Sequence, residues 1–116
     1  MSVYGVHAAR AQFVIEKRHA DPALSVERVA RLIGISTQHL CRVLRRERGF
    51  TFAELLRDVR LREARRLLRE SSCSMKEIAF RVGFRHPSQF TRAFAGECGV
   101  PPSQYRSVLL PAAPCP

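Results

Sequence analysis

Apolar residues recur at intervals of three and four along almost the whole chain, whereas alternation with a period of two never persists. The first spacing is typical of amphipathic helices and the second would indicate strands, so an all-α fold is predicted. The first expected helix covers Val6 to Arg18. Its apolar face is expected to consist of Val6, Ala9, Phe13 and Val14. Asp21-Pro22 follows it as a break, because a residue before proline is pushed out of the helical region.

A pair of short helices is predicted next. Ser25 offers an N-cap for the first, and Gly34-Ile35-Ser36 turns the chain. Ser36 can then cap a second helix from Thr37 to about Arg48, which Gly49 ends as a left-handed C-cap. The inward residues of this pair are predicted to be Val29, Ala30, Ile33, Leu40, Val43 and Leu44.

The longest predicted helix opens with the capping box Thr51-Phe52-Ala53-Glu54 and ends before Ser71-Ser72-Cys73. Its apolar stripe is expected to consist of Phe52, Leu55, Leu56, Val59, Ala64, Leu67 and Leu68. About 18 helical residues span roughly 27 Å, which is long enough for a strut between two units.

A second pair of short helices follows this strut. The capping box Ser74-Met75-Lys76-Glu77 opens it, Gly83-Phe84 forms the turn, and Pro87 occupies the first position of the next helix. Phe90, Ala93 and Phe94 are predicted to point inward, and Gly99 closes the helix. A last short helix begins at Pro102, and residues 111–116 are expected to be a disordered tail.

The two helix pairs are copies of one pattern. Ser25, Val29, Ala30, Ile33, Gly34 and Ile35 match Ser74, Ile78, Ala79, Val82, Gly83 and Phe84 at an offset of 49 residues. Leu40, Arg42, Leu44 and Gly49 match Phe90, Arg92, Phe94 and Gly99 at an offset of 50. Helix, glycine turn and helix within about twenty residues is typical of a helix-turn-helix, whose second helix can enter the DNA major groove.

The repeat therefore predicts about seven helices in two helix-turn-helix subdomains bridged by a long linker helix. The expected boundaries are 1–50 for the first subdomain, 51–71 for the linker and 72–110 for the second subdomain. Two such readers in one chain can address two major-groove segments about 34 Å apart, one turn of DNA.

Charge points to an anionic partner. The 116 residues carry 20 Lys plus Arg against 10 Asp plus Glu, a net charge of +10. All of these cations except Lys17 and Lys76 are arginine, which suits forked contacts with phosphates and guanine edges. For a well-patterned globular chain, nucleic acid is favoured over a membrane surface. Coding bias combined with solvated helix faces would also enrich arginine.

Several function classes find little support. Cys41, Cys73, Cys98 and Cys115 have neither close pairing nor metal-ligand spacing, so no metal is expected. No cofactor is expected either, and no nucleophile elbow or phosphate loop indicates an enzyme. No apolar run approaches the roughly 20 residues of a membrane span. A reducing cytoplasm, in association with the nucleoid, is the expected location.

The second helix pair resembles a known family. Ile78-Ala79, Gly83-Phe84, Phe90-Thr91-Arg92-Ala93-Phe94 and Gly99-Val100-Pro101-Pro102-Ser103-Gln104-Tyr105-Arg106 resemble the signature of the AraC/XylS transcription regulators. The resemblance extends over roughly Val6 to Val108 and implies that family's DNA-binding domain. It also implies base contacts from the exposed faces of both recognition helices.

Three positions depart from the family's pattern. Ala95, which Gly96 follows, stands where a basic residue commonly comes after the phenylalanine, which removes an expected phosphate contact. His86 replaces the usual short polar cap, and Pro87 has no side chain that could donate to a base.

Subtracting the inward positions leaves one candidate base-reading face on each recognition helix. The predicted base contacts are Gln38, Cys41, Arg42, Ser88, Gln89 and Arg92. Arginine suits guanine and glutamine suits adenine, while Cys41 offers a small surface to a thymine methyl. Plain solvent exposure is the competing interpretation of the glutamines.

Predicted phosphate contacts surround these faces. They are Ser36, Thr37, Arg45, Arg46, Arg48, Lys76, Arg81, Arg85 and Thr91. The first recognition helix holds four arginines and the second only Arg92. The first unit is therefore expected to provide most of the electrostatic affinity, and the second mainly to tune sequence choice.

Double-stranded promoter or operator DNA is the expected partner, bound by a monomer, with RNA polymerase as a further candidate and no membrane partner. Two alternatives remain open. A non-specific nucleic-acid binder would need free aromatic residues for stacking, and the phenylalanines mostly fall in inward positions. A thiol-responsive regulator would use a cysteine such as Cys41, which lies on the expected reading face.

Overall fold

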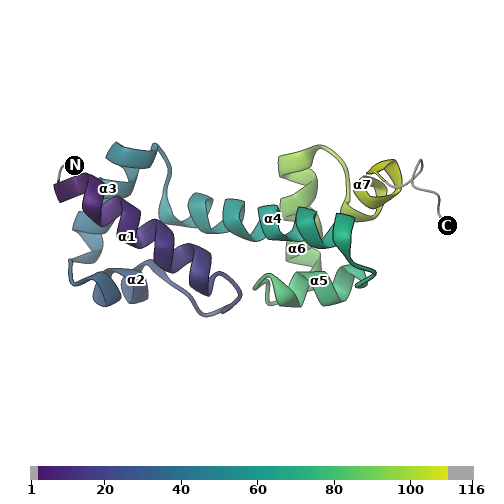
Figure 1. Ribbon diagram of the computed structural model, residues 1–116, viewed down its shortest axis with the longest axis horizontal. Coiled ribbons are helices and arrows are strands. Elements are labelled where there is room, and N and C mark those ends of the chain that lie inside the picture. Colours follow the sequence, from purple (N-terminus) through teal and green to yellow (C-terminus); the bar gives the residue numbers. More distant parts are fainter. Residues whose placement is uncertain (1–2, 110–116) are drawn as a thin grey trace. The chain divides into compact units, whose positions relative to one another are not determined.

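The computed structural model describes residues 3–109, all of whose regular elements are helices (Figure 1). The seven helices are α1 (Val3–Arg18), α2 (Val26–Ile33), α3 (Thr37–Arg48), α4 (Phe52–Glu70), α5 (Met75–Arg81), α6 (Pro87–Cys98) and α7 (Pro102–Leu109). The prediction of an all-α fold with about seven helices and a long linker helix is confirmed. The predicted tail, residues 111–116, lies outside the described residues, as does Cys115.

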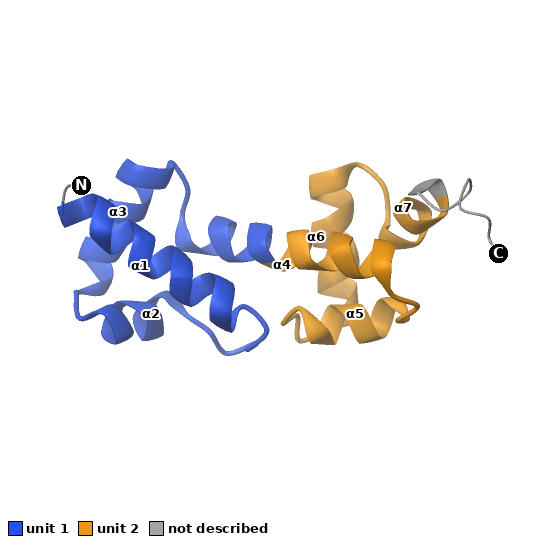
Figure 2. Ribbon diagram, in the orientation of Figure 1, with its two compact units in different colours: residues 1–59 blue, residues 60–116 orange. Residues whose placement is uncertain are grey.

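The chain forms two compact units, residues 1–59 and residues 60–116, shown in blue and orange in Figure 2. The division falls within α4, so the first half of that helix belongs to unit 1 and the second half to unit 2. Each unit has a hydrophobic core of its own. A helix-turn-helix pair packs against part of α4 in both cases, α2–α3 in unit 1 and α5–α6 in unit 2.

Helix ends follow the capping residues of the sequence. Both predicted capping boxes are present: Thr51 exchanges hydrogen bonds with Glu54, and Ser74 does the same with Glu77. The C-cap glycines Gly49 and Gly99 have φ angles of 77° and 81°, in the left-handed region predicted for them.

Unit 1 is built around α1, which packs on both α2 and α3. The predicted inward face of α1 was wrong at three of its four residues: Phe13 is 62% exposed and Val6 38% exposed, and Ala9 also faces solvent, whereas Val14 is half-buried against the core. The buried residues are Ala8, Ala11 and Ile15. The buried face of α1 thus combines two alanines with Ile15, so hydrophobicity alone did not identify it.

The inner face of α4 agrees with the predicted stripe. Leu55, Leu56 and Val59 are buried in the core of unit 1, while Ala64, Leu67 and Leu68 are buried in the core of unit 2. Leu61, which the stripe omitted, is completely buried in unit 2. It lies where α4 passes from one core to the other and changes the face that it buries.

Aromatic rings fill the core of unit 2. Phe90 and Phe94 of α6 are completely buried, with ring centroids 5.7 Å apart. Phe84 from the turn contacts Phe90 at 5.7 Å, and Tyr105 of α7 contacts Phe94 at 5.2 Å. The Arg60 guanidinium of α4 lies over the Phe84 ring, 5.7 Å from its centroid. These contacts hold α6 between α4, the turn and α7.

Candidate DNA-binding interface

The turns of the two helix-turn-helix units have the same backbone geometry. Gly34 and Gly83 have φ angles of 82° and 108°, which only glycine adopts easily. Ile35 N–H donates to the Ala30 carbonyl at 3.0 Å. At the matching positions Phe84 N–H donates to the Ala79 carbonyl, also at 3.0 Å. The internal repeat predicted from sequence is thus present in three dimensions.

The first helix of each helix-turn-helix pair, α2 or α5, also begins in the same way. Ser25 Oγ accepts from Arg28 N–H at 3.2 Å, and Ser74 Oγ accepts from Glu77 N–H at 3.1 Å. Only the second unit completes the capping box, since Arg28 stands where Glu77 stands in the repeat. The two units therefore share a scaffold but differ in the charges that they place on it.

The predicted reading face of α3 is open to solvent. Gln38, Cys41, Arg42 and Arg45 are all exposed, and their spacing of three, four and seven puts them on one side of the helix. The opposite side, formed by Leu40, Val43 and Leu44, is buried. Within residues 3–109, the side chains of Gln38, Cys41 and Arg42 have no hydrogen bond or ion pair, and the Cys41 thiol is free. All three remain available to a ligand.

Ser36 and Thr37 lie at the N-terminus of α3. Ser36 Oγ accepts from His39 N–H at 3.1 Å, which confirms the predicted cap. A hydroxyl that accepts a hydrogen bond can still donate its own hydrogen, so the cap is compatible with a phosphate contact. Thr37 is half-buried beside it.

Three arginines crowd the last turn of α3: Arg45, Arg46 and Arg48, all exposed. The Arg46 guanidinium lies over the ring of Tyr4 in α1, 5.0 Å from its centroid. A stacked guanidinium keeps its in-plane N–H groups free, so Tyr4 orients Arg46 without occupying its donors. The sequence pattern missed Tyr4, because the expected first helix began at Val6.

His39 points away from the reading face of α3. Its ring contacts Tyr4 at 5.5 Å and His7 at 5.4 Å, both on α1. His7 Nδ1 is buried and lacks a hydrogen-bond partner among the described residues. His39 therefore belongs to the contact between α1 and α3.

The reading face of α6 is shorter and less basic. Ser88, Gln89 and Arg92 are exposed, and residues 3–109 provide no hydrogen bond or ion pair to their side chains. Ala95 and Gly96 continue this face without a polar side chain, and the last turn of α6 has no basic residue.

The predicted phosphate contacts of unit 2 differ in their availability. Lys76, Arg81 and Arg85 are exposed. Thr91 is exposed as well, but its Oγ1 donates to the Pro87 carbonyl at 3.1 Å. A hydroxyl has one hydrogen, so Thr91 would have to give up this bond before donating to a phosphate.

The start of α6 lacks a side-chain cap. His86 occupies the N-cap position with extended backbone angles, yet its side chain bonds no N–H of the first turn. Pro87 at the next position has no N–H to satisfy, which reduces the need for a cap. The departure from short polar caps noted in the sequence thus has a structural consequence.

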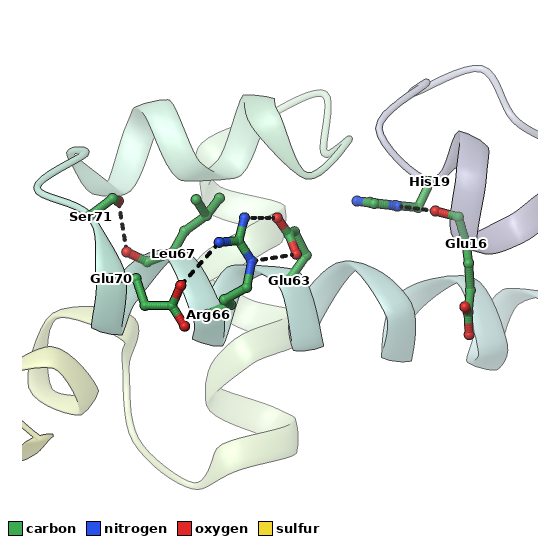
Figure 3. A network of polar contacts seen from close by, with 7 residues as sticks. All are labelled: Glu16, His19, Glu63, Arg66, Leu67, Glu70 and Ser71. Atoms are coloured by element: carbon green, nitrogen blue, oxygen red, sulfur yellow. Dashed lines mark hydrogen bonds and ion pairs between the residues drawn. The ribbon is translucent and has the colours of Figure 1, made fainter.

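Not every arginine of α4 is available to a ligand. Arg66 bonds Glu63 through Nε at 3.0 Å and Glu70 through Nη1 at 3.2 Å, as Figure 3 shows. Its hydrogen bonds to Glu63 raise the pKa of Arg66 above its already high ordinary value. Ser71, also drawn there, donates to the Leu67 carbonyl at 2.7 Å.

Other kinds of site find no support in the part of the chain that the structure describes. Residues 3–109 contain no group of three or more His, Cys, Asp or Glu side chains able to hold a metal ion. No helix among them has the length and apolar character needed to cross a membrane.

Comparison with known proteins identifies the family. A family model described as a helix-turn-helix domain, of the AraC type, matches residues 29–107, which run from within α2 to α7 and include both recognition helices. The chain belongs to the AraC-type helix-turn-helix family of transcription regulators. Its two units are those of an AraC-type DNA-binding domain, as the resemblance in the sequence implied.

Solved AraC-type domains share the fold. The C-terminal domain of AraT, a response regulator from Geobacillus stearothermophilus, superposes with a TM-score of 0.88 at 34% identity, over 92% of this chain and 88% of that one. The DNA-binding domain of AdpA, a global transcriptional factor, matches with a TM-score of 0.83 at 27% identity over 100% of both chains. That domain was solved in complex with a target DNA.

Curated relatives of this AraC-type chain include longer regulators. GlxA, a helix-turn-helix transcriptional regulator from Rhizobium meliloti, is 43% identical over 83 residues, which are 70% of this chain and 26% of GlxA. The chain spans about a quarter to a third of the length of the first curated relatives that it matches.

Proposed function

We propose that this AraC-type chain binds double-stranded promoter DNA at a specific sequence, with α3 and α6 each lying in a segment of the major groove. The observation that carries the proposal is the pair of matched units, each presenting a polar, solvent-exposed recognition helix. The AdpA domain, which shares this fold and was solved with a target DNA, supports the same conclusion.

The chemistry of the two faces suggests which bases they read. Arg42 and Arg92 hold repeat-equivalent positions, and each can donate two hydrogen bonds to O6 and N7 of a guanine. Gln38 and Gln89 can bond both N6 and N7 of an adenine. Ser88 can bond a base edge, and Cys41 fits against a thymine methyl.

Phosphate contacts fix the position of each unit but carry little sequence information. In unit 1 we assign them to Ser36, Thr37, Arg45, Arg46 and Arg48. In unit 2 we assign them to Lys76, Arg81, Arg85 and Thr91. Because α3 has a basic last turn and α6 has none, unit 1 supplies most of the electrostatic affinity.

A monomer is the binding species in this proposal, since one chain already carries two readers. Promoter DNA in the nucleoid is its partner, and RNA polymerase is the second partner that a promoter-bound regulator would contact.

Selection from random DNA duplexes, followed by footprinting on the enriched sequence, tests the proposal directly. We expect an enriched motif with two segments about one helical turn apart, and protection along one face of the duplex by a monomer. Protection of a single major-groove segment would contradict the two-reader model.

The same experiments separate the competing functions. A selection that returned no enriched motif would indicate a non-specific nucleic-acid binder. Binding that weakened reversibly after treatment with hydrogen peroxide, and no longer did so in a Cys41→Ser variant, would indicate thiol control through the exposed Cys41.

A further inference from the structure

The end of α4 lacks the glycine that ends other helices of this chain. Gly34, Gly49 and Gly99 terminate α2, α3 and α6 in the left-handed conformation. After α4 the sequence instead reads Ser71-Ser72-Cys73, without glycine. The last carbonyls of a helix have no partner within it, so they need another donor.

Ser71 supplies the donor for the Leu67 carbonyl, and Arg106 of α7 supplies the donor for the next one. Its Nε bonds the Leu68 carbonyl in the last turn of α4 at 3.1 Å. Its Nη2 bonds the Ser71 carbonyl at 3.1 Å, and its Nη1 bonds the Cys73 carbonyl at 2.8 Å. One guanidinium thus spans the whole link from the end of α4 to the residue before Ser74, the N-cap of α5.

In unit 1, the corresponding link between α1 and α2 is held by residues close to it in the sequence. Asp21 Oδ1 accepts from Ala23 N–H at 2.8 Å within the link between α1 and α2. Asp21 Oδ2 pairs with Arg28 of α2 at 3.1 Å. The start of the first helix-turn-helix is therefore set by nearby residues. The second link has a local bond as well, from Cys73 N–H to Ser71 Oγ at 3.3 Å, but it is also held by Arg106, more than thirty positions later in the sequence.

Arg106 is also joined to the recognition helix. The preceding residue, Tyr105, packs its ring against Phe94 of α6 at 5.2 Å. Two successive residues of α7 therefore contact different parts of unit 2. Tyr105 packs on α6, and Arg106 bonds the link that leads into α5. The fork of an arginine can bond several carbonyls at once, which a lysine ammonium cannot do in the same geometry.

We infer that Arg106 is the positioning residue of the second reader: it sets the placement of α5 and α6 for DNA without touching DNA itself. This inference rests on the proposed function, because it concerns how accurately α6 meets its bases. In this inference, α7 affects sequence discrimination by unit 2 and does not affect discrimination by unit 1.

The test compares Arg106→Gln and Arg106→Lys with Arg69→Gln in the full chain. Arg69 is an exposed arginine near the end of α4, so its substitution removes the same charge without removing the three carbonyl bonds. Affinity is measured for the selected duplex and for two versions in which either the first or the second segment is scrambled. Amide hydrogen exchange at α5, without DNA, reports the anchoring separately.

For Arg106→Gln we expect discrimination against the duplex scrambled in the second segment to fall about tenfold, comparable to losing one base-specific contact. Discrimination at the first segment should be unchanged. Arg106→Lys should lie between wild type and Arg106→Gln, and Arg69→Gln should discriminate as wild type does. Exchange at α5 should be faster in Arg106→Gln.

Three results would overturn the inference. The first is that Arg106→Gln discriminates against the duplex scrambled in the second segment as well as wild type does. The second is that it loses discrimination equally at both segments. The third is that it loses helical content in circular dichroism, which would show that Arg106 is required for folding. Failure of the proposed function has a different outcome: the wild-type chain would then discriminate at neither segment, while the exchange result at α5 would still stand.

Discussion

The two helix-turn-helix units share their backbone turns and differ in almost everything attached to them. Gly34 and Gly83 both have positive φ angles, and the residue after each of them donates to the matching alanine carbonyl. Behind the first turn lies an aliphatic core around Leu40, and behind the second lies an aromatic core around Phe90. The glycine recurs at both turns because few other residues adopt its φ angle, whereas the matched core positions can hold different apolar side chains.

The recognition helices differ in a similar way. The first, α3, has a serine cap and a basic last turn, and is held by α1 through Tyr4. The second, α6, has no side-chain cap and no basic residue in its last turn, and is held by α7 through Tyr105. One repeated scaffold thus carries one strongly basic reader and one nearly neutral reader.

Core truncation should show the largest effect and tests whether the units unfold separately. Phe90→Ala removes a completely buried ring and should lower the free energy of unfolding of unit 2 by about 3–5 kcal/mol. Leu40→Ala, its repeat-equivalent, should lower that of unit 1 by about 2–5 kcal/mol. Urea unfolding followed by residue-resolved amide exchange measures both. Equal acceleration of exchange in both units by either variant would contradict the division into two cores.

Arginine removal tests the difference in charge between the readers. Arg42→Ala and Arg92→Ala should each reduce discrimination for the selected duplex by about 1–3 kcal/mol. Non-specific affinity should fall more for Arg42→Ala, because Arg42 belongs to the basic helix. Titration of a specific and an unrelated duplex at several salt concentrations measures both quantities, with Arg69→Ala as the control for charge alone. Equal non-specific losses would remove the proposed asymmetry.

Substitutions at the N-cap residues of α3 and α6 test how each recognition helix begins. Ser36→Ala should lower the free energy of unfolding by about 1 kcal/mol, because His39 N–H loses its acceptor. His86→Ser should raise it by up to about 1 kcal/mol by supplying the cap that α6 lacks. Thermal unfolding measures both changes. If His86→Ala, which adds no acceptor, stabilised as much as His86→Ser, capping would not be the cause.

Low pH should destabilise the start of α5 through its capping box, and this is the smallest of the expected effects. The hydrogen bond from Ser74 N–H lowers the pKa of the Glu77 carboxyl below its ordinary value of 4.5. A carboxyl whose pKa is lower in the folded state stabilises the fold above its unfolded pKa and loses that contribution as pH falls through the folded value. Protection of α5 amides should therefore fall below about pH 4.5.

The start of α2 should lack this dependence once Asp21, whose carboxylate pairs with Arg28, is replaced by Asn, because Arg28 stands where the repeat has Glu77. A Glu77→Gln variant should make α5 insensitive to pH over the same range. Glu54, whose pKa is lowered by the hydrogen bond from Thr51 N–H, should behave as Glu77 does at the start of α4. Identical pH profiles for α2 of the Asp21→Asn chain and α5 of the wild-type chain would show that the capping box is not responsible.

Much of this molecule could be predicted without coordinates. The helices, their caps and the repeated turn follow from residues close together in sequence, because hydrogen bonds at helix ends form within three or four positions. The exposed faces of α3 and α6 follow from the same periodicity. Their assignment to particular bases and phosphates stays a prediction until the DNA experiments are done.

Tertiary structure decided what local pattern does not encode. It placed Ala8 and Ala11 of α1 in the core and left Phe13 in solvent, although phenylalanine is the more hydrophobic residue. It also brought Tyr4 to Arg46, and Arg106 to the end of α4. Which side chains meet across distant helices depends on how whole faces pack, and that packing is a property of the complete fold.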